Sequence, residues 1–154
     1  MDRSLHTQIW GANASYWDNV LGPNGNNFYK HLVTPTALKL LAIPPPDAES
    51  TDNIEILELA YGNGIFSCDL ISLNPNIRVF ATGFSCAILR IARDRLDETD
   101  VESGLVEIRE VDITSERDLS NLRYWPGPRV AFDRIVCKRV FAVKFALVTW
   151  QNLF

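Results

Sequence analysis

The 154-residue sequence has few of the side chains on which metal sites and nucleophilic catalysis usually depend. Its histidines, His6 and His31, are isolated from each other, and its three cysteines, Cys68, Cys86 and Cys137, lie far apart. No Cys/His spacing resembles a zinc site, and no Ser-His-Asp set is evident. We therefore expect no bound metal, packing or surface roles for the histidines, and buried thiols in a reducing compartment for the cysteines.

The sequence also lacks a cluster of basic residues and an apolar run long enough to cross a bilayer. The 15 basic residues are outnumbered by 19 acidic ones, and the net charge is -4, so electrostatic binding to nucleic acid is not expected. The N-terminus, Met-Asp-Arg-Ser-Leu-His, has no apolar signal core, and the apolar stretch 140–150 is short and interrupted by Lys144. These observations predict a cytoplasmic protein with neither nucleic acid nor a membrane as its partner.

What the sequence does contain is a regular alternation of strands and helices. Apolar residues make up 47% of the chain, which suffices for the core of one domain. Two helices are expected first, at 4–20 and 27–42, and Pro44-Pro45-Pro46 ends the second. The segments that follow are strands at 54–60, 77–82, 105–111 and 131–137, helices at 64–73 and 85–98, and a short helix or turn at 115–122. This alternation predicts an α/β fold with a parallel, doubly wound sheet.

The most informative stretch runs from Ile56 to Ser67 and reads Ile-Leu-Glu-Leu-Ala-Tyr-Gly-Asn-Gly-Ile-Phe-Ser. A short apolar run ends at Ala60, a tight turn with Gly62 and Gly64 follows, and a helix-compatible segment comes next. Glycine is needed where the chain reverses sharply and where a ligand must approach bare backbone. The pattern therefore predicts a ligand site where a buried strand ends and a helix begins.

Several other segments carry the same kind of information. They are Trp10–Asp18 and Gly25–Tyr29 near the N-terminus, Val79–Ser85 running into Ile88–Arg93, Val111–Ile113, and Phe132–Cys137. In this order, and over roughly residues 8–137, the motifs resemble the small-molecule branch of the class I S-adenosylmethionine-dependent methyltransferases. The resemblance implies a Rossmann-like, doubly wound parallel sheet with strand order 3-2-1-4, and N-terminal helices over its carboxyl edge.

The same resemblance implies a site for S-adenosylmethionine. The residues implied are Glu58, Ala60, Gly62 and Gly64 around the methionine part of the cofactor, Phe84 on the adenine, Asp112 at the adenine amino group, and Asn26, Phe28 and Tyr29 closing over the cofactor. Some of these residues also fit ordinary structural roles. Phe28 and Tyr29 recur at helical spacing and fit core or lid packing, and Asp112 fits a cap for the turn before 115–122. The position of Glu58 at the end of a buried strand favours a role in a polar site over an ordinary structural role.

One position departs from the family. An acid just after the second strand accepts hydrogen bonds from both ribose hydroxyls in the family, and Gly83 stands at that position here. A carboxylate suits a vicinal diol because it offers two acceptors. Each lost hydrogen bond is worth about 1.5–3 kcal/mol, so we expect cofactor affinity to be lower by about tenfold to several hundredfold. Gly83→Asp is expected to restore part of it.

The sequence stops following the family after Cys137. The family's sheet continues beyond its fourth strand, whereas residues 138–154 diverge, and Lys138 stands where an Asn is expected. We therefore expect three parts: an N-terminal helical lid and linker at 1–53, a Rossmann-like nucleotide-binding core at 54–137, and a divergent apolar tail at 138–154.

Methyl transfer needs little acid–base chemistry, because it depends on aligning a sulfonium methyl with a nucleophile in a dry pocket. A scaffold of this type can therefore lose transfer and keep its cavity. The resemblance favours a truncated, degenerate methyltransferase-like protein of small-molecule secondary metabolism, with weak or lost methyl transfer. Two alternatives stay open: a cyclase, isomerase or lyase acting on a natural product, and a non-catalytic partner of a full-length methyltransferase. The strand at 131–137 would lie at a sheet edge, which predicts a homodimer.

Overall fold

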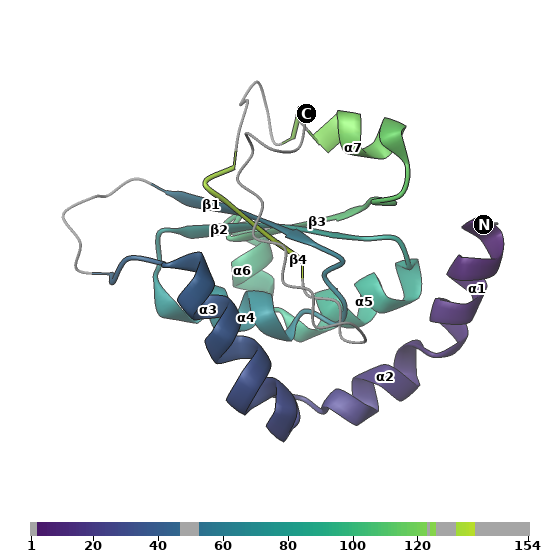
Figure 1. Cartoon of the computed structure of the whole chain (residues 1–154), viewed down its shortest axis with the longest axis horizontal. Helices are drawn as coiled ribbons and strands as arrows, with labels where there is room; N and C mark the ends of the chain where they lie inside the picture. Colours follow the sequence, from purple (N-terminus) through teal and green to yellow (C-terminus); the bar gives the residue numbers. More distant parts are fainter. Residues whose placement is uncertain (1–2, 47–52, 123, 126–131, 138–154) are drawn as a thin grey trace.

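The fold is described here from a computed structural model, which covers residues 3–46, 53–122, 124–125 and 132–137 (Figure 1). In chain order the elements are α1 (Arg3–Ala12), α2 (Ala14–Leu21), the π-helical η1 (Tyr29–Val33), α3 (Thr34–Leu41), β1 (Ile54–Leu59), α4 (Ile65–Leu73), β2 (Ile77–Gly83), α5 (Cys86–Arg95), α6 (Glu98–Glu102), β3 (Val106–Glu110), α7 (Glu116–Leu122) and β4 (Arg134–Cys137). The predicted linker at 47–52 and tail at 138–154 lie outside the described residues.

The four strands form one parallel sheet in the order β3-β2-β1-β4, as the sequence predicted. In the central strand β1, Ile56 pairs with Val79 of β2 on one side and with Arg134 of β4 on the other. Both faces of β1 are covered, which explains why its sequence is mostly apolar rather than alternating. The predicted class, a Rossmann-like α/β fold with N-terminal helices, is confirmed.

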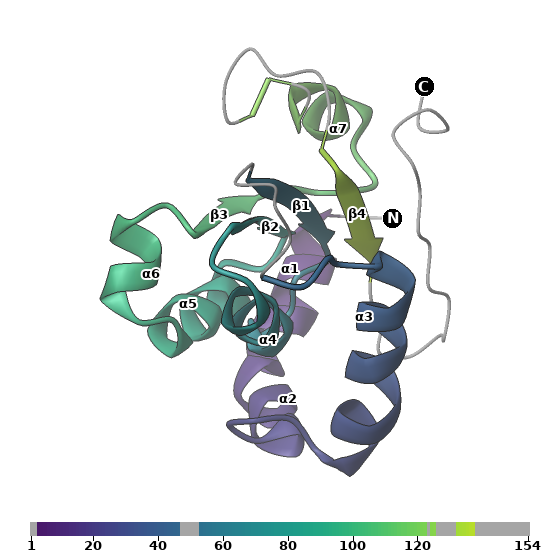
Figure 2. The same cartoon turned by 90° about the vertical axis from the view of Figure 1, so that its left-hand side faces the viewer.

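Helices cover the two faces of the sheet unequally. Figures 1 and 2 show α3, α4 and α5 on one side of the sheet and α7 on the other. Successive strand residues point to opposite faces, so Ile56 belongs to the larger core beneath α3, α4 and α5, and Leu57 to a smaller one beside α7. The smaller core also contains Phe80, Trp125 and Phe132. Each large apolar side chain buried in this way contributes about 1.5–3 kcal/mol.

The single helix predicted over 4–20 is wrong, because the chain breaks at Asn13 between α1 and α2. The Asn13 side-chain amide donates to the carbonyl of Ile9 at 2.7 Å, alongside the Asn13 backbone N–H, which donates to the same oxygen at 3.2 Å. Asparagine competes with regular helical hydrogen bonding in this way. Both helices pack against α5.

The segment predicted as a helix over 27–42 is helical, but it contains a π-helical turn at Tyr29–Val33. The backbone N–H of Thr34 donates to the carbonyl of Tyr29, five residues back. Pro35 follows immediately, and proline has no N–H and clashes with the carbonyl four residues before it, that of His31. A widened turn accommodates this clash.

Later boundaries differ from the predictions by a few residues, with one larger difference. The helix predicted over 85–98 ends at Arg95, because Leu96 and Asp97 are extended, each with ψ 144°, before α6 begins. The described part of the strand predicted at 131–137 begins at Arg134. Within the described ranges no helix combines the length and apolar character needed to span a bilayer.

Candidate functional site

The loop between β1 and α4 reverses through three residues with left-handed backbone. Ala60, Gly62 and Gly64 have φ values of 53°, 68° and 86°. Glycine adopts this region freely, whereas an alanine there costs roughly 1–2 kcal/mol. Gly64 is required for a second reason, because a Cβ at this position would lie 2.9 Å from the Tyr61 hydroxyl. The predicted turn is therefore present, and it places bare backbone at the N-terminus of α4.

Glu58 lies beneath this loop and is fully buried, with 0% of its surface exposed. Its Oε2 accepts a 2.6 Å hydrogen bond from Ser67 Oγ of α4. Burial, and after it the Glu58 carboxylate, raises the pKa of both Tyr29 and Tyr61 far above the usual range. Both phenols therefore stay protonated beside the carboxylate. Glu58 therefore lies inside the protein, below the turn, and its part in a ligand site stays a prediction.

A polar network joins this loop to the N-terminal helices. Asn63 Nδ2 donates to Asp18 Oδ1 of α2 at 2.8 Å. Arg95 of α5 donates from Nε to the Asn63 carbonyl at 2.9 Å, and its guanidinium also pairs with the Asp18 carboxylate and binds the Pro23 carbonyl. The network thus fixes α2 and the glycine turn relative to α5. No sequence motif indicated this network, because Asp18 and Arg95 are 77 positions apart.

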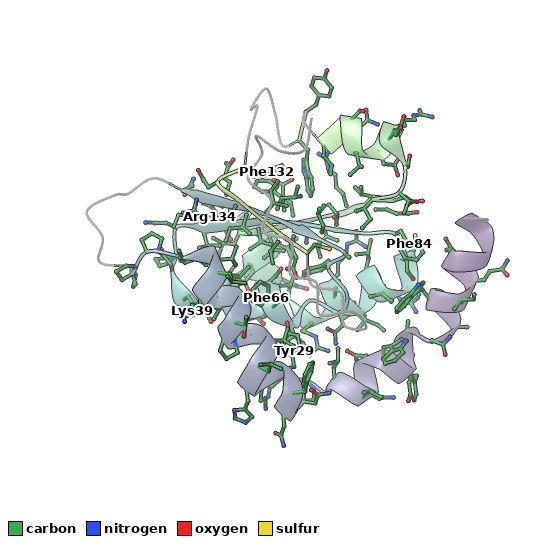
Figure 3. All side chains as sticks on the ribbon, viewed as in Figure 1. Tyr29, Lys39, Phe66, Phe84, Phe132 and Arg134 are labelled. Atoms are coloured by element: carbon green, nitrogen blue, oxygen red, sulfur yellow. The ribbon has the colours of Figure 1, made fainter. Side chains whose placement is uncertain are left out.

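The end of β2 forms the next part of the carboxyl edge. A Cβ at Gly83 would lie 2.9 Å from Leu89 Cδ2, so any side chain there requires the Leu89 side chain to move. Ser85 is the N-cap residue that precedes α5 and is 3% exposed, and its Oγ has no hydrogen-bond partner among the described residues. Phe84, between them, is half-buried and lies near α1 at the end of the sheet (Figure 3).

Glu110 lies beside Gly83 although no sequence motif pointed to it. It is the last residue of β3 and pairs in register with Gly83. Its Oε2 accepts a 2.8 Å hydrogen bond from the Cys86 thiol in the first turn of α5. This hydrogen bond is the main reason that the pKa of Cys86 is raised. Only the strand register, which the sequence does not state, could have identified this residue.

Asp112 follows β3 and caps a turn. Its Oδ1 accepts hydrogen bonds from the Thr114 backbone N–H at 2.9 Å and from Thr114 Oγ1 at 2.7 Å. Its own backbone N–H donates to Asp118 Oδ2 of α7 at 3.0 Å. These contacts are the ones expected if Asp112 caps the turn before 115–122. The contact with an adenine amino group stays a prediction.

The three residues expected to close over the cofactor have different surroundings. Asn26 Oδ1 accepts the backbone N–H of Tyr29 at 3.0 Å, which is a helix-capping contact. Phe28 is 48% exposed, whereas Tyr29 is buried in the larger core together with Phe66 (Figure 3). Tyr29 and Glu58 are therefore brought together below the turn, and Phe28 lies on the outer surface.

Within the part of the chain that the structure describes, no group of three or more His, Cys, Asp and Glu side chains is arranged to hold a metal ion. The polar groups at the carboxyl edge are instead backbone amides, single carboxylates and hydroxyls. Such groups suit an organic ligand with hydroxyl and charged substituents.

Comparison with known proteins identifies this architecture. A precorrin-6y C5,15-methyltransferase from Geobacter metallireducens matches with a TM-score of 0.50 and 20% identity, covering 72% of this chain and 50% of that protein. The delta-N METTL16 methyltransferase domain matches with a TM-score of 0.53 and 14% identity, covering 70% of this chain and 46% of that one. A malonyl-(acyl-carrier protein) O-methyltransferase from Acetivibrio thermocellus is 29% identical over 73 residues.

The chain is methyltransferase-like in fold and in sequence. The aligned 73 residues cover 47% of this methyltransferase-like chain but 26% of the Acetivibrio enzyme, so the chain spans about a quarter of that relative's length. It spans about half the length of the two solved structures. No family model matches the sequence.

Proposed function

We propose that this chain binds S-adenosylmethionine at the carboxyl edge of β1 and β2 and that its methyl transfer to a small molecule is weak or lost. The observation that carries the proposal is the β1–α4 turn before the N-terminus of α4, in which Ala60, Gly62 and Gly64 are left-handed and Gly62 is exposed. The methyltransferase-like fold supports the choice of ligand.

The cofactor, when bound, supplies an electrophilic methyl group on a sulfonium. The N-terminus of α4 favours the negative charge of its methionine carboxylate, because helix N-termini attract anions. Glu58, buried directly below, favours a nearby positive charge such as the amino group or the sulfonium. The Asp18–Arg95–Asn63 network holds the turn in place, so the loop is ordered before the ligand binds.

Gly83 is the reason to propose weak binding. Without a carboxylate at this position, the ribose diol loses the acceptor that the resemblance assigns to it. Weak cofactor binding favours the second candidate, a scaffold that binds a small molecule but catalyses cyclisation, isomerisation or elimination instead of methylation. A non-catalytic subunit paired with a related methyltransferase is the third. Cys68, Cys86 and Cys137 form no disulfide with one another, which supports a reducing, cytoplasmic location. The prediction that their thiols are buried is wrong, because Cys86 is exposed and Cys68 and Cys137 are partly exposed.

Calorimetric titration with S-adenosylhomocysteine, together with a methyl-transfer assay using radiolabelled S-adenosylmethionine, tests the proposal. We expect saturable binding with a dissociation constant above the micromolar range and little or no transfer to small-molecule acceptors. Rapid transfer would contradict the loss of activity. An absence of binding at millimolar ligand would contradict the function itself.

A further inference from the structure

The glycine turn after β1 is held in shape by contacts with other parts of the chain. Asn63 lies between Gly62 and Gly64, and glycine adopts many backbone conformations, so the residues of the turn do not fix its geometry by themselves. The Asn63 side chain donates to Asp18 Oδ1 of α2 at 2.8 Å, and its carbonyl accepts a hydrogen bond from Arg95 Nε of α5 at 2.9 Å. Two contacts with other helices therefore hold the middle of the turn.

Arg95 closes these contacts into a ring. Its Nη2 donates to the same Asp18 oxygen that accepts from Asn63, so each of the three residues is bonded to the other two. Its Nη1 donates to the carbonyl of Pro23, just after α2. The side chains of Arg95 and Asp18 are 15% and 29% exposed, so their ion pair is shielded from solvent more than a surface pair is.

The docking of α2 relies on such polar contacts because little of the helix belongs to the apolar cores. Among the side chains of α1 and α2 that the structure describes, Ala14 is the one that is buried, and Leu21 packs against the larger core only in part. Tyr16 and Val20 are 60% and 43% exposed. Figures 1 and 2 show α2 farther from the sheet than α5. Elements that bury few apolar side chains are the first to detach in local unfolding.

We propose that the Asp18–Arg95–Asn63 ring couples the docking of α2 against α5 to the formation of the turn that binds S-adenosylmethionine. Arg95 is then a positioning residue, which acts on the ligand through Asn63 and does not contact it. By thermodynamic linkage the coupling works in both directions, so release of α2 weakens ligand binding and a bound ligand holds α2 in place. The inference rests on the proposed function for its ligand, whereas the link between α2 and the turn exists without one.

Amide hydrogen exchange of the whole chain, followed by mass spectrometry, tests the link without ligand. Asp18→Asn keeps the size of the side chain and removes its charge. We expect about tenfold faster exchange both in α2 and in the turn at 60–64, which the substitution does not touch. Exchange in β1 should stay unchanged, which separates local release from a loss of global stability. Asp94→Asn removes an exposed carboxylate of α5 and should leave all three segments unchanged.

The same measurement with S-adenosylhomocysteine tests the linkage to the ligand. In the native chain, saturating ligand should slow exchange in α2 as well as in the turn. Arg95→Gln removes the guanidinium that makes three contacts and should lower the affinity about tenfold in calorimetry. At saturating ligand this variant should keep the protection of the turn and lose that of α2. Arg90→Gln makes the same charge change at an exposed position of α5 and should behave as the native chain does.

The outcomes distinguish this inference from the proposed function. The coupling is overturned if Asp18→Asn speeds exchange in α2 and leaves the turn unchanged, or if Arg95→Gln keeps the ligand-dependent protection of α2. If the native chain does not bind S-adenosylhomocysteine, the proposed function fails. The ligand-free comparison of Asp18→Asn with Asp94→Asn then still decides whether α2 and the turn are coupled.

Discussion

At the residue scale, the glycine turn after β1 offers a matched pair of substitutions. Gly62 and Gly104 have nearly equal φ values, 68° and 72°, and a Cβ at either position would have no heavy atom within 4 Å. Gly62 lies in the proposed site, whereas Gly104 lies before β3 at the amino edge of the sheet. The two positions therefore have the same backbone strain but different neighbourhoods.

We expect Gly62→Ala and Gly104→Ala to lower the stability of the chain equally, by about 1–2 kcal/mol, because each forces an alanine into the left-handed region. Only Gly62→Ala should also weaken the binding of S-adenosylhomocysteine, by about tenfold or more. The reason is that the methyl group of the new alanine would lie where the ligand approaches the backbone. Thermal unfolding and calorimetry measure the two effects. Equal affinities in both variants would show that the turn does not contact the ligand.

Part of this site could be predicted from the sequence and part could not. Gly62 and Gly64 were identified because a turn with two glycines between a strand and a helix has a local signature. Glu110 and the Asp18–Arg95 pair had no such signature, since their positions depend on strand register and on how α2 packs against α5. Local patterns indicate backbone geometry, and long-range side-chain contacts need the three-dimensional arrangement.

At the element scale, the strands were predicted better than the helices. Their apolar, β-branched runs end at turn residues, and the boundaries of β1 and β2 agree with the prediction to within one residue. The helices over 4–20 and 85–98 were drawn too long, because Asn13 and the extended pair Leu96 and Asp97 interrupt patterns that otherwise continue. The helical spacing of the residues continues across such breaks, so the sequence pattern does not reveal them.

In the smaller core beside α7, one tryptophan makes contacts of several kinds. Trp125 is 1% exposed, donates from Nε1 to Glu107 Oε2 at 2.8 Å, and has the Arg109 guanidinium 4.5 Å from its ring centroid. Its ring also meets that of Phe80 edge-on, with the centroids 5.2 Å apart. The neighbouring Tyr124 is 69% exposed and provides a control.

We expect Trp125→Phe to lower the free energy of unfolding by about 1–3 kcal/mol, because it removes a hydrogen bond to a carboxylate and weakens the cation–π contact. Tyr124→Phe should change it by less than about 0.5 kcal/mol. Urea denaturation followed by circular dichroism gives both values. Equal effects would mean that the hydrogen bond to Glu107 and the contact with Arg109 contribute little to stability.

At the scale of the whole molecule, β4 is one of the two outer strands of the sheet in the described part of the chain, and β3 is the other. The outer side of β4 pairs with no described strand, and exposed strand edges favour association with a second chain. We therefore propose a homodimer that joins two β4 edges about a two-fold axis. Light scattering should give twice the chain mass of 17.4 kDa, and a mass of 17.4 kDa throughout the micromolar range would contradict the dimer.

The central claim is that the carboxyl edge of β1 and β2 binds S-adenosylmethionine, and an NMR titration tests it most directly. Backbone amide signals of a ¹⁵N-labelled chain would be followed while S-adenosylhomocysteine is added. We predict saturable shifts at Gly62, Gly64 and Gly83 and none at Gly104, which lies at the opposite edge of the sheet. Unchanged signals at all four glycines, or shifts confined to Gly104, would contradict the account.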